Sequence, residues 1–376
     1  TVGGDFVLGA TASILADGKG YTSARGPGAG TGWVDGSASA THGGVGGDSG
    51  HRASRNTYGS VEAPVNLGSA SGNPGGGAIL LTVSGAATIG GVISANGGSG
   101  TYGCGSGGSV FITAGALAGA GILRANGGVG GYSSGGGGRI ALVLTGAAGD
   151  FASWTGVETA YGATGGGRSG AGTVYRRSGS GEDWLIVDNN NYGMGLDNIT
   201  LMPAGVNLGD YSHIVVRNKG VLGVRADTAL DFGAFNIAPV DAANSFVAII
   251  GDGAVTYPAN WILEGYTLRG EGISKPLQNV TIRNGGVLSS TASLNATVRT
   301  LTLNIAGDLT VEATGSIGLD GAGYASGNGP GASPSSGQDG GAGGTHGGIG
   351  GEATTKLASK NTYGSILAPM LPGSAS

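Results

Sequence analysis

Short apolar runs recur along the second half of the chain, and polar turn residues separate them. The clearest runs occupy residues 185–187, 199–201, 214–216, 221–222, 246–250, 280–282 and 309–311. Turn residues such as Asn218-Lys219-Gly220 and Asn284-Gly285-Gly286 lie between them. Runs of this length between turns predict β-strands. No apolar period of 3.6 residues continues for the roughly 10 to 12 residues that a helix needs, so we expect an all-β protein.

A glycine-rich region repeats with a period of about 30 residues. Residues 93–98 (ISANGG) return as residues 123–128 (LRANGG), and residues 107–112 (GGSVFI) return as residues 137–142 (GGRIAL). Each unit is predicted to contain a strand, a turn, a second short strand ending in Asn-Gly-Gly, and a glycine-rich excursion. Units that resemble their neighbours, without a closed set of hairpin turns, favour a solenoid of stacked strands over a sandwich or a propeller.

The two ends of the chain also resemble each other. Residues 17–21 (DGKGY) are echoed by residues 320–324 (DGAGY), 303 residues later. The motif THGG at residue 41 returns after 304 residues, and NTYGS at residue 56 returns after 305. The chain therefore holds one period of about 305 residues and the first 71 residues of the next, and we expect it to be a window from a longer array. The alternative is a single loop module duplicated at each end.

These patterns divide the chain into four segments. Residues 1–71 are an end segment equivalent to residues 304–376, which begin the next repeat. Residues 72–182 are predicted to hold glycine-rich coils, and residues 183–303 to hold regular coils without the excursions.

Composition excludes several classes of protein. Glycine supplies 86 of the 376 residues, yet 39% of the residues are hydrophobic, which a flexible linker or a disordered chain does not show. The glycines do not fall on every third position throughout, which excludes collagen, and no apolar run approaches the length of a membrane-spanning helix. A net charge of -5 with 18 basic residues provides no basic stripe for nucleic acid.

So much glycine requires a physical reason, because glycine in regular structure costs about 0.5 to 1 kcal/mol relative to alanine. Residues 340–351 place glycines at a spacing of three, which is the period of an extended left-handed helix. The excursions are predicted to stack as polyglycine II segments in a layer beside the β-coils; irregular loops with positive φ are the alternative. The candidate assembly residues are Tyr21, His42, Tyr58, Tyr324, His346, Tyr363, Gly340, Gly341, Gly343, Gly344, Gly347, Gly348, Gly350 and Gly351.

Catalytic and metal-binding patterns are weak. The carboxylate pairs to consider are Asp227 with Asp231, Glu264 with Glu271, and Glu182 with Asp183. We expect these to be solvated loop charges rather than the paired acids of a glycosidase. His42 recurs as His346, but His51 has no counterpart, so no repeated histidine metal site is predicted. The sequence thus predicts no catalytic residue, no cofactor site and no metal site.

Several isolated features carry less weight. Residues 188–191 (DNNN) are expected to form an asparagine turn rather than a calcium loop. The single cysteine, Cys104, is predicted to be a structural thiol, with an intermolecular disulfide as the alternative. Glycosylation sequons stand at Asn198, Asn279 and Asn295.

The repeat strings resemble a known class of protein. Residues 105–112 and 135–142, residues 172–175 followed by 185–189, and the pair 13–21 and 316–324 are similar to the glycine-rich repeat regions of very large bacterial surface proteins. Those regions resemble pectate-lyase-like right-handed parallel β-helices and the shafts of autotransporter or filamentous-haemagglutinin adhesins. The resemblance implies a right-handed parallel β-helix with an extracellular structural or adhesive role.

The sequence therefore predicts a non-enzymatic structural module of a long extracellular fibre or cell-surface adhesin. Open coil ends and low charge favour self-association, so its main partners are expected to be further copies of the repeat. A cell-surface or polysaccharide ligand is a further expected partner. Two alternatives stay open: a polysaccharide-degrading β-helix enzyme, which needs a groove with two carboxylates, and a glycan- or ice-binding module, which needs an exposed threonine ladder.

Overall fold

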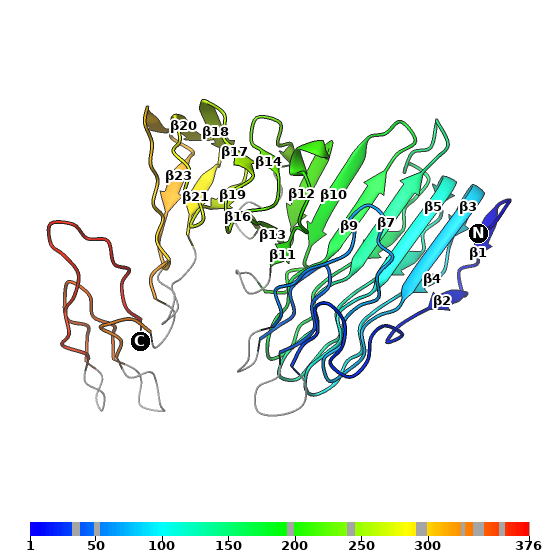
Figure 1. Cartoon of the computed structure of the whole chain (residues 1–376), viewed down its shortest axis with the longest axis horizontal. Coiled ribbons are helices and arrows are strands. Elements are labelled where there is room, and N and C mark those ends of the chain that lie inside the picture. The colour runs from blue at the N-terminus through cyan, green and yellow to red at the C-terminus, as the bar shows by residue number, and fades with distance from the viewer. Residues whose placement is uncertain are drawn as a thin grey trace. The chain divides into compact units, whose positions relative to one another are not determined.

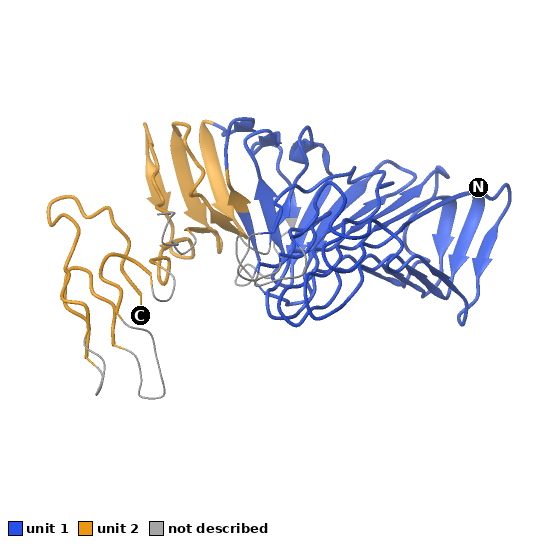
Figure 2. Ribbon diagram, turned by 60° about the horizontal axis from the view of Figure 1, so that its bottom comes forward, with its two compact units in different colours: residues 1–247, 251–258 blue, residues 248–250, 259–376 orange. Residues whose placement is uncertain are grey.

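The computed structural model describes residues 1–31, 38–48, 53–193, 199–238, 245–290, 299–324, 328–333, 342–352 and 358–375. Nearly all regular structure in these residues is β-strand, with mostly parallel pairing, which confirms the all-β prediction. The chain divides into two compact units (Figure 2): unit 1 holds residues 1–247 and 251–258, and unit 2 holds residues 248–250 and 259–376. None of the helical structure described is long and apolar enough to cross a lipid bilayer.

Unit 1 contains sixteen of the strands and one turn of 3-10 helix. These are β1 Phe6–Leu8, β2 Ser13–Leu15, β3 Ala78–Ile89, β4 Val92–Ser94, β5 Ser109–Ala118, β6 Ile122–Arg124, β7 Arg139–Leu144, β8 Val157–Thr159, β9 Thr173–Arg177, β10 Asp183–Asp188, β11 Thr200–Leu201, η2 Leu208–Asp210, β12 His213–Arg217, β13 Val221–Val224, β14 Leu230–Asp231, β15 Ile237–Ala238 and β17 Val255–Thr256. Strand β16, Phe246–Ile249, lies where the chain passes between the units.

The 30-residue sequence period corresponds to one repeating unit of two strands and an excursion, and we use the word coil for such a unit. Ser109 of β5 pairs in parallel with Ala78 of β3 on one side and with Arg139 of β7 on the other. In the same coils, Val92 of β4 pairs with Ile122 of β6. Each coil therefore gives one strand to an eight-stranded sheet, which begins β1-β3-β5-β7, and one to the four-stranded sheet β2-β4-β6-β8 (Figure 1).

The hydrophobic core of these coils combines side chains from both sheets. Alternate residues of a strand face opposite sides, so Val110 and Ile112 of β5 are buried while Phe111 between them is partly exposed. They belong to one cluster with Ile93 of β4 and Leu123 of β6. Each large aliphatic side chain buried in this way contributes about 1.5 to 3 kcal/mol.

One pair of strands departs from the parallel arrangement. Strands β9 and β10 pair antiparallel, with Arg177 opposite Asp183. Gly181 adopts φ 91° in the connecting turn, and its amide donates to the carbonyl of Ser178 at 3.0 Å. A loop of this length suits a hairpin and cannot make a parallel crossover. The sequence patterns did not indicate this local hairpin, after which β10 and β12 pair in parallel again.

Unit 2 repeats the two-sheet pattern with shorter strands. Its strands are β18 Asn260–Glu264, β19 Thr267–Arg269, β20 Asn279–Arg283, β21 Val287–Ser289, β22 Leu309–Val311 and β23 Ser316–Gly318. Strands β18, β20 and β22 form one parallel sheet, and β19, β21 and β23 pair in parallel in another. Trp261, Leu263 and Ile282 are buried beneath them.

Most of the predicted strands are present. The runs at 185–187, 214–216, 221–222 and 280–282 lie in β10, β12, β13 and β20, and the run at 309–311 is β22. Residues 200–201 of the run at 199–201 form β11, and residues 246–249 of the run at 246–250 form β16.

Candidate assembly interface

The glycine-rich excursions of unit 1 form a layer of their own. This glycine layer consists of residues 38–48, 68–76, 95–108, 125–138 and 160–172. These segments run below the strands in Figure 1. These segments contain almost no strand, and their backbone amides bond from one segment to another. The layer therefore joins the end segment 1–71 to three successive coils.

Within this layer, the backbone hydrogen bonds of residues 105–108 and 135–138 change partner with a period of three residues. The amides of residues 135–138 donate in turn, at 2.7 to 3.0 Å, to the carbonyls of Gly128, Ala40, Gly170 and Ala125. One coil earlier, the amides of residues 105–108 donate in turn, at 2.8 to 3.1 Å, to Gly98, Ser69, Gly136 and Ala95. The first and fourth partners belong to the same coil, the second to the end segment, and the third to the next coil. Because a β-strand directs successive amides to only two sides, these segments are not part of a sheet.

The layer leaves no space for side chains at its central positions. A Cβ atom on Gly136 would lie 1.9 Å from the carbonyl oxygen of Gly44. A Cβ atom on Gly138 would lie 2.1 Å from that of Gly108, and one on Gly172 would lie 1.7 Å from that of Gly138. None of these three glycines has a positive φ. Glycine is therefore required here by close approach of backbones and not by the loop conformation that positive φ would indicate.

His42 holds the end segment against this layer. It is fully buried and stacks on Tyr58, with ring centroids 4.4 Å apart. Its Nδ1 lies 2.8 Å from the carbonyl oxygen of Gly107, so that nitrogen carries the proton and donates. Burial, followed by the neighbouring Arg139 cation, lowers the pKa of His42 to about 3. The ring is therefore neutral across the physiological range.

Arg139 and Thr57 make further bonds between the end segment and the rest of unit 1. The fully buried Arg139 donates from Nε to the carbonyl of Tyr58 and from Nη1 to Thr173 Oγ1, both at 2.9 Å. Thr57 Oγ1 donates to the carbonyl of Leu201 at 2.8 Å. Burial lowers the pKa of Arg139 to about 10, which leaves it charged at neutral pH. Sequence reasoning missed Arg139, since its partner Tyr58 stands 81 residues away.

The equivalent segment of unit 2 has the same local structure. His346 and Tyr363 contact each other with centroids 4.5 Å apart, as His42 and Tyr58 do. Tyr363 Oη donates to the carbonyl of Pro372 at 2.6 Å, where Tyr58 donates to that of Leu67 at 2.7 Å. The end segment and its equivalent in unit 2 therefore share the same internal contacts.

The predicted glycines of unit 2 have varied surroundings. Gly340 and Gly341 lie outside the described residues. The amide of Gly343 donates to the carbonyl of Gly351 at 2.8 Å, and a Cβ atom on Gly344 or Gly350 would lie 2.4 or 2.1 Å from a backbone oxygen. A Cβ atom on Gly347, Gly348 or Gly351 would have nothing within 4 Å.

The two remaining tyrosines each cover a glycine. A Cβ atom on Gly26 would lie 2.7 Å from the Tyr21 ring, and one on Gly329 would lie 2.6 Å from the Tyr324 ring. Both glycines have φ 104°, so the same tyrosine-covered turn occurs in both copies.

The carboxylates considered from the sequence lie mainly in surface pairs. Asp227 pairs with Arg225 at 3.2 Å, Glu264 with Arg283 at 2.8 Å, and Glu182 with His213 at 2.7 Å. No group of three or more histidine, cysteine, aspartate or glutamate side chains able to hold a metal gathers within the described ranges. Cys104 is a buried thiol whose Sγ lies 3.6 Å from the carbonyl of Gly100.

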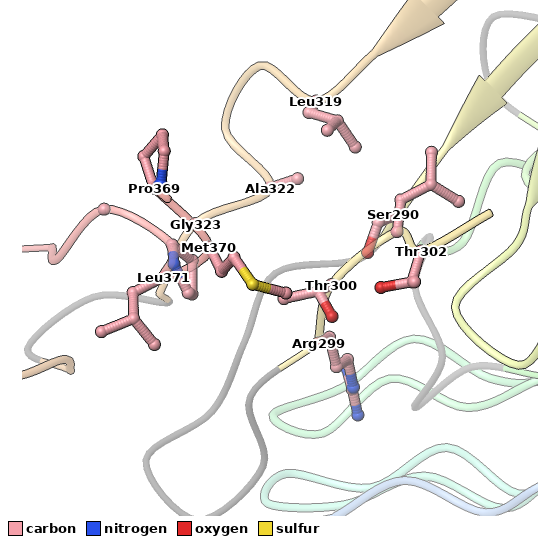
Figure 3. A pocket seen from close by; sticks show the side chains of 13 residues that line it. Ser290, Arg299, Thr300, Thr302, Leu319, Ala322, Gly323, Pro369, Met370 and Leu371 are labelled. Atoms are coloured by element: carbon pink, nitrogen blue, oxygen red, sulfur yellow. The ribbon is translucent and has the colours of Figure 1, made fainter. Parts of the chain in front are cut away.

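Each unit has a hollow large enough to hold a small ligand. One in unit 2 has a volume of about 360 Å³ and is lined by apolar and hydroxyl side chains, among them Met370 and Thr300, and by Arg299, without a carboxylate (Figure 3). One in unit 1 has a volume of about 460 Å³, and Glu62 and Asp210 are among its lining residues. The second has the two carboxylates that a polysaccharide-cleaving groove needs. A far smaller hollow of about 20 Å³ is also lined by two carboxylates, Glu158 and Asp188, but these pair with Arg176 and Arg217.

Comparisons with protein families, curated proteins and solved structures found no match to this chain.

Proposed function

We propose that this chain is a structural repeat module of a long extracellular or cell-surface fibre, and that further copies of the same repeat are its partners. The observation that carries this proposal is the three-residue alternation of hydrogen bonds at residues 105–108 and 135–138 of the glycine layer. A layer bonded through backbone in three directions is stiff, and it can grow by adding one coil after another. That property suits a shaft.

The coils are proposed to wind as a right-handed parallel β-helix. Parallel pairing at a spacing of 30 residues supports this, because Val92 pairs with Ile122 while Ser109 pairs with Arg139. Parallel strands connected through a crossover are right-handed in nearly all proteins. The resemblance to adhesin shafts agrees with the same winding and supports the extracellular location.

The glycine layer is proposed to consist of polyglycine II segments. That helix has three residues per turn and forms no hydrogen bonds within itself, so its amides bond outward in three directions. Residues 105–108 and 135–138 both show this pattern. The absence of space for Cβ atoms explains why glycine occupies these positions.

End-to-end growth is supported by the two copies of the end segment. Strand β1 pairs with β3, which follows it in the chain, with Phe6 opposite Ala87. Its equivalent β22 pairs with β20, which precedes it, with Leu309 opposite Val280. The same strand thus accepts a neighbour at either edge, as an interior strand of a continuous stack does.

The proposal is tested by the length of chains built from one, two and three repeats. Electron microscopy is expected to show rods whose length increases by a constant step while their width stays the same. Rounded particles whose width grows with repeat number would contradict a shaft.

The hollow beside Glu62 and Asp210 favours polysaccharide degradation as a second candidate. Glu62 is replaced by Leu367 in the equivalent copy, so this pair does not recur with the repeat. Release of reducing sugar from polysaccharides by the native chain, lost in both Glu62→Gln and Asp210→Asn, would establish the second candidate. If no polysaccharide tested releases reducing sugar, the second candidate is rejected and the structural role stands.

A further inference from the structure

The equivalent amides of the two end segments differ in their partners. In unit 1, the amides of Gly43 and Gly44 both donate to the carbonyl of Gly137 at 2.9 Å. The amide of Val45 donates to the carbonyl of Ile199 at 3.0 Å. The corresponding amides of residues 347–349 form no backbone hydrogen bond to any described coil. One copy is therefore docked on glycine-rich coils and the other is not.

Apolar side chains at equivalent positions show the same difference. Val45 and Val61 of unit 1 are 1% and 2% exposed. Their equivalents Ile349 and Ile366 are 58% and 98% exposed. Both positions hold β-branched aliphatic residues in each copy, so the uncovered copy keeps the side chains that the covered copy buries. Exposed aliphatic side chains grouped in this way mark an interaction surface.

The glycines of the uncovered copy support the same conclusion. A Cβ atom on Gly43 would lie 2.4 Å from the carbonyl oxygen of Gly138, and one on Gly44 would lie 2.0 Å from that of Gly170. Gly347 and Gly348 have open space in unit 2 and no positive φ. Nothing in the described part of unit 2 requires glycine at these two positions, whereas a docked coil would require it.

We infer that residues 342–352 and 358–373 present a docking surface for the glycine-rich coils of a second copy of the repeat, the copy's equivalents of residues 97–172. This inference rests on the proposed function and names the surface through which one repeat would bind the next. The amides of Gly347 and Gly348 would donate to the second copy's counterpart of the Gly137 carbonyl. Ile349 and Ile366 would be covered as Val45 and Val61 are. The matching local structure of the two copies means that the surface is already shaped for this partner.

Hydrogen exchange in a two-repeat chain tests the inference. Residues 373–376 repeat residues 68–71, so the full chain followed directly by a second copy of residues 72–376 keeps the natural order. We expect the amides of residues 343–351 to exchange at least about 100-fold more slowly there than in the single-repeat chain. Their protection should approach that of residues 39–47. Rapid exchange of this segment in both chains would overturn the inference, and so would equal protection in the single-repeat chain.

A substitution separates this surface from general stability. Gly348→Ala is expected to leave the single-repeat chain unchanged, since its Cβ atom meets nothing there, but to remove the protection gained in the two-repeat chain. Ala368→Ser is the matched control, because Ala368 and its equivalent Ala63 are both exposed. Full protection in the Gly348→Ala two-repeat chain would contradict the docking described. Two-repeat rods of double length without protection of residues 343–351 would reject this surface while leaving the proposed function standing.

Discussion

At the scale of single residues, glycine serves two different purposes in this protein. Gly181 permits a hairpin turn through its φ of 91°, and Gly26 permits a turn beneath Tyr21 through its φ of 104°. Gly136, in contrast, has an ordinary φ and is needed because the carbonyl of Gly44 passes where its side chain would be. Composition alone does not distinguish these purposes, since both need only the absence of a Cβ atom.

Adding one methyl group at Gly136 is expected to destabilise the protein strongly. Overpacking costs typically about 1 to 3 kcal/mol, and a Cβ atom 1.9 Å from a backbone oxygen belongs at or above the upper end of this range. Gly131→Ala is the control, because its Cβ atom would have no neighbour closer than 3.4 Å. Denaturant unfolding should show a lower free energy of unfolding for Gly136→Ala and almost no change for Gly131→Ala. Equal effects of the two substitutions would argue against close backbone packing.

Burial of neutral His42 predicts a pH dependence of stability. The pKa of His42 is lowered from 6.5 to about 3 in the folded chain. Between these values the unfolded chain binds a proton that the folded chain does not, so stability falls as the pH decreases. The loss is about 1.4 kcal/mol for each pH unit. The free energies of unfolding of the native chain and of His42→Gln, measured as a function of pH, should converge as the pH falls from 6.5. A constant difference between them would show that His42 has an ordinary pKa in the folded chain.

At the scale of elements, side chains at the ends of strands fix the register between coils. Asp17, Asn96 and Asn126 stand at the same point of successive coils. Asp17 Oδ1 accepts from the amide of Asn96 at 2.6 Å, and Asn96 Oδ1 accepts from that of Asn126 at 2.8 Å. Asn126 Oδ1 in turn accepts from the amide of Tyr161 at 2.8 Å. This ladder marks where each strand gives way to its excursion.

Breaking one step of the ladder is expected to cost about 1 to 3 kcal/mol, because Asn126→Ala leaves the Tyr161 amide without its acceptor. Asn126→Asp keeps that acceptor and loses only the bond from Nδ2 to Thr159 Oγ1, so its cost should be smaller. Asp17 already fills an equivalent place with a carboxylate. Chemical denaturation of the two variants measures the difference; an aspartate variant as unstable as the alanine variant would show that the acceptor does not matter.

The sequence predicted the strands well where apolar and turn residues alternate clearly, as in β10, β12 and β20. It did not predict β18 and β19, and it did not predict the hairpin between β9 and β10. The partners of the glycine layer could not be predicted either, because glycine has no side chain to indicate what it contacts. Arg139 was missed for a related reason: the previous coil has Ser109 at its position, and only the folded chain brings it to Tyr58.

At the scale of the whole molecule, the internal repeat gives two views of one junction. The first copy pairs with the coil that follows it, and the second copy pairs with the coil that precedes it. Together they describe a coil with a neighbour on each side, which neither copy shows alone. The low fraction of charged residues, 11%, agrees with the proposal that further copies of the repeat are the partners of this chain.

Fibre diffraction from oriented chains of several repeats tests the central claim most directly. Hydrogen-bonded strands lie about 4.7 to 4.9 Å apart, so coils stacked along a shaft should give a strong reflection at that spacing along the fibre axis. We predict this axial reflection, with its intensity increasing with the number of repeats in the chain. A reflection at the same spacing perpendicular to the axis, or none, would contradict the continuous stacking of coils.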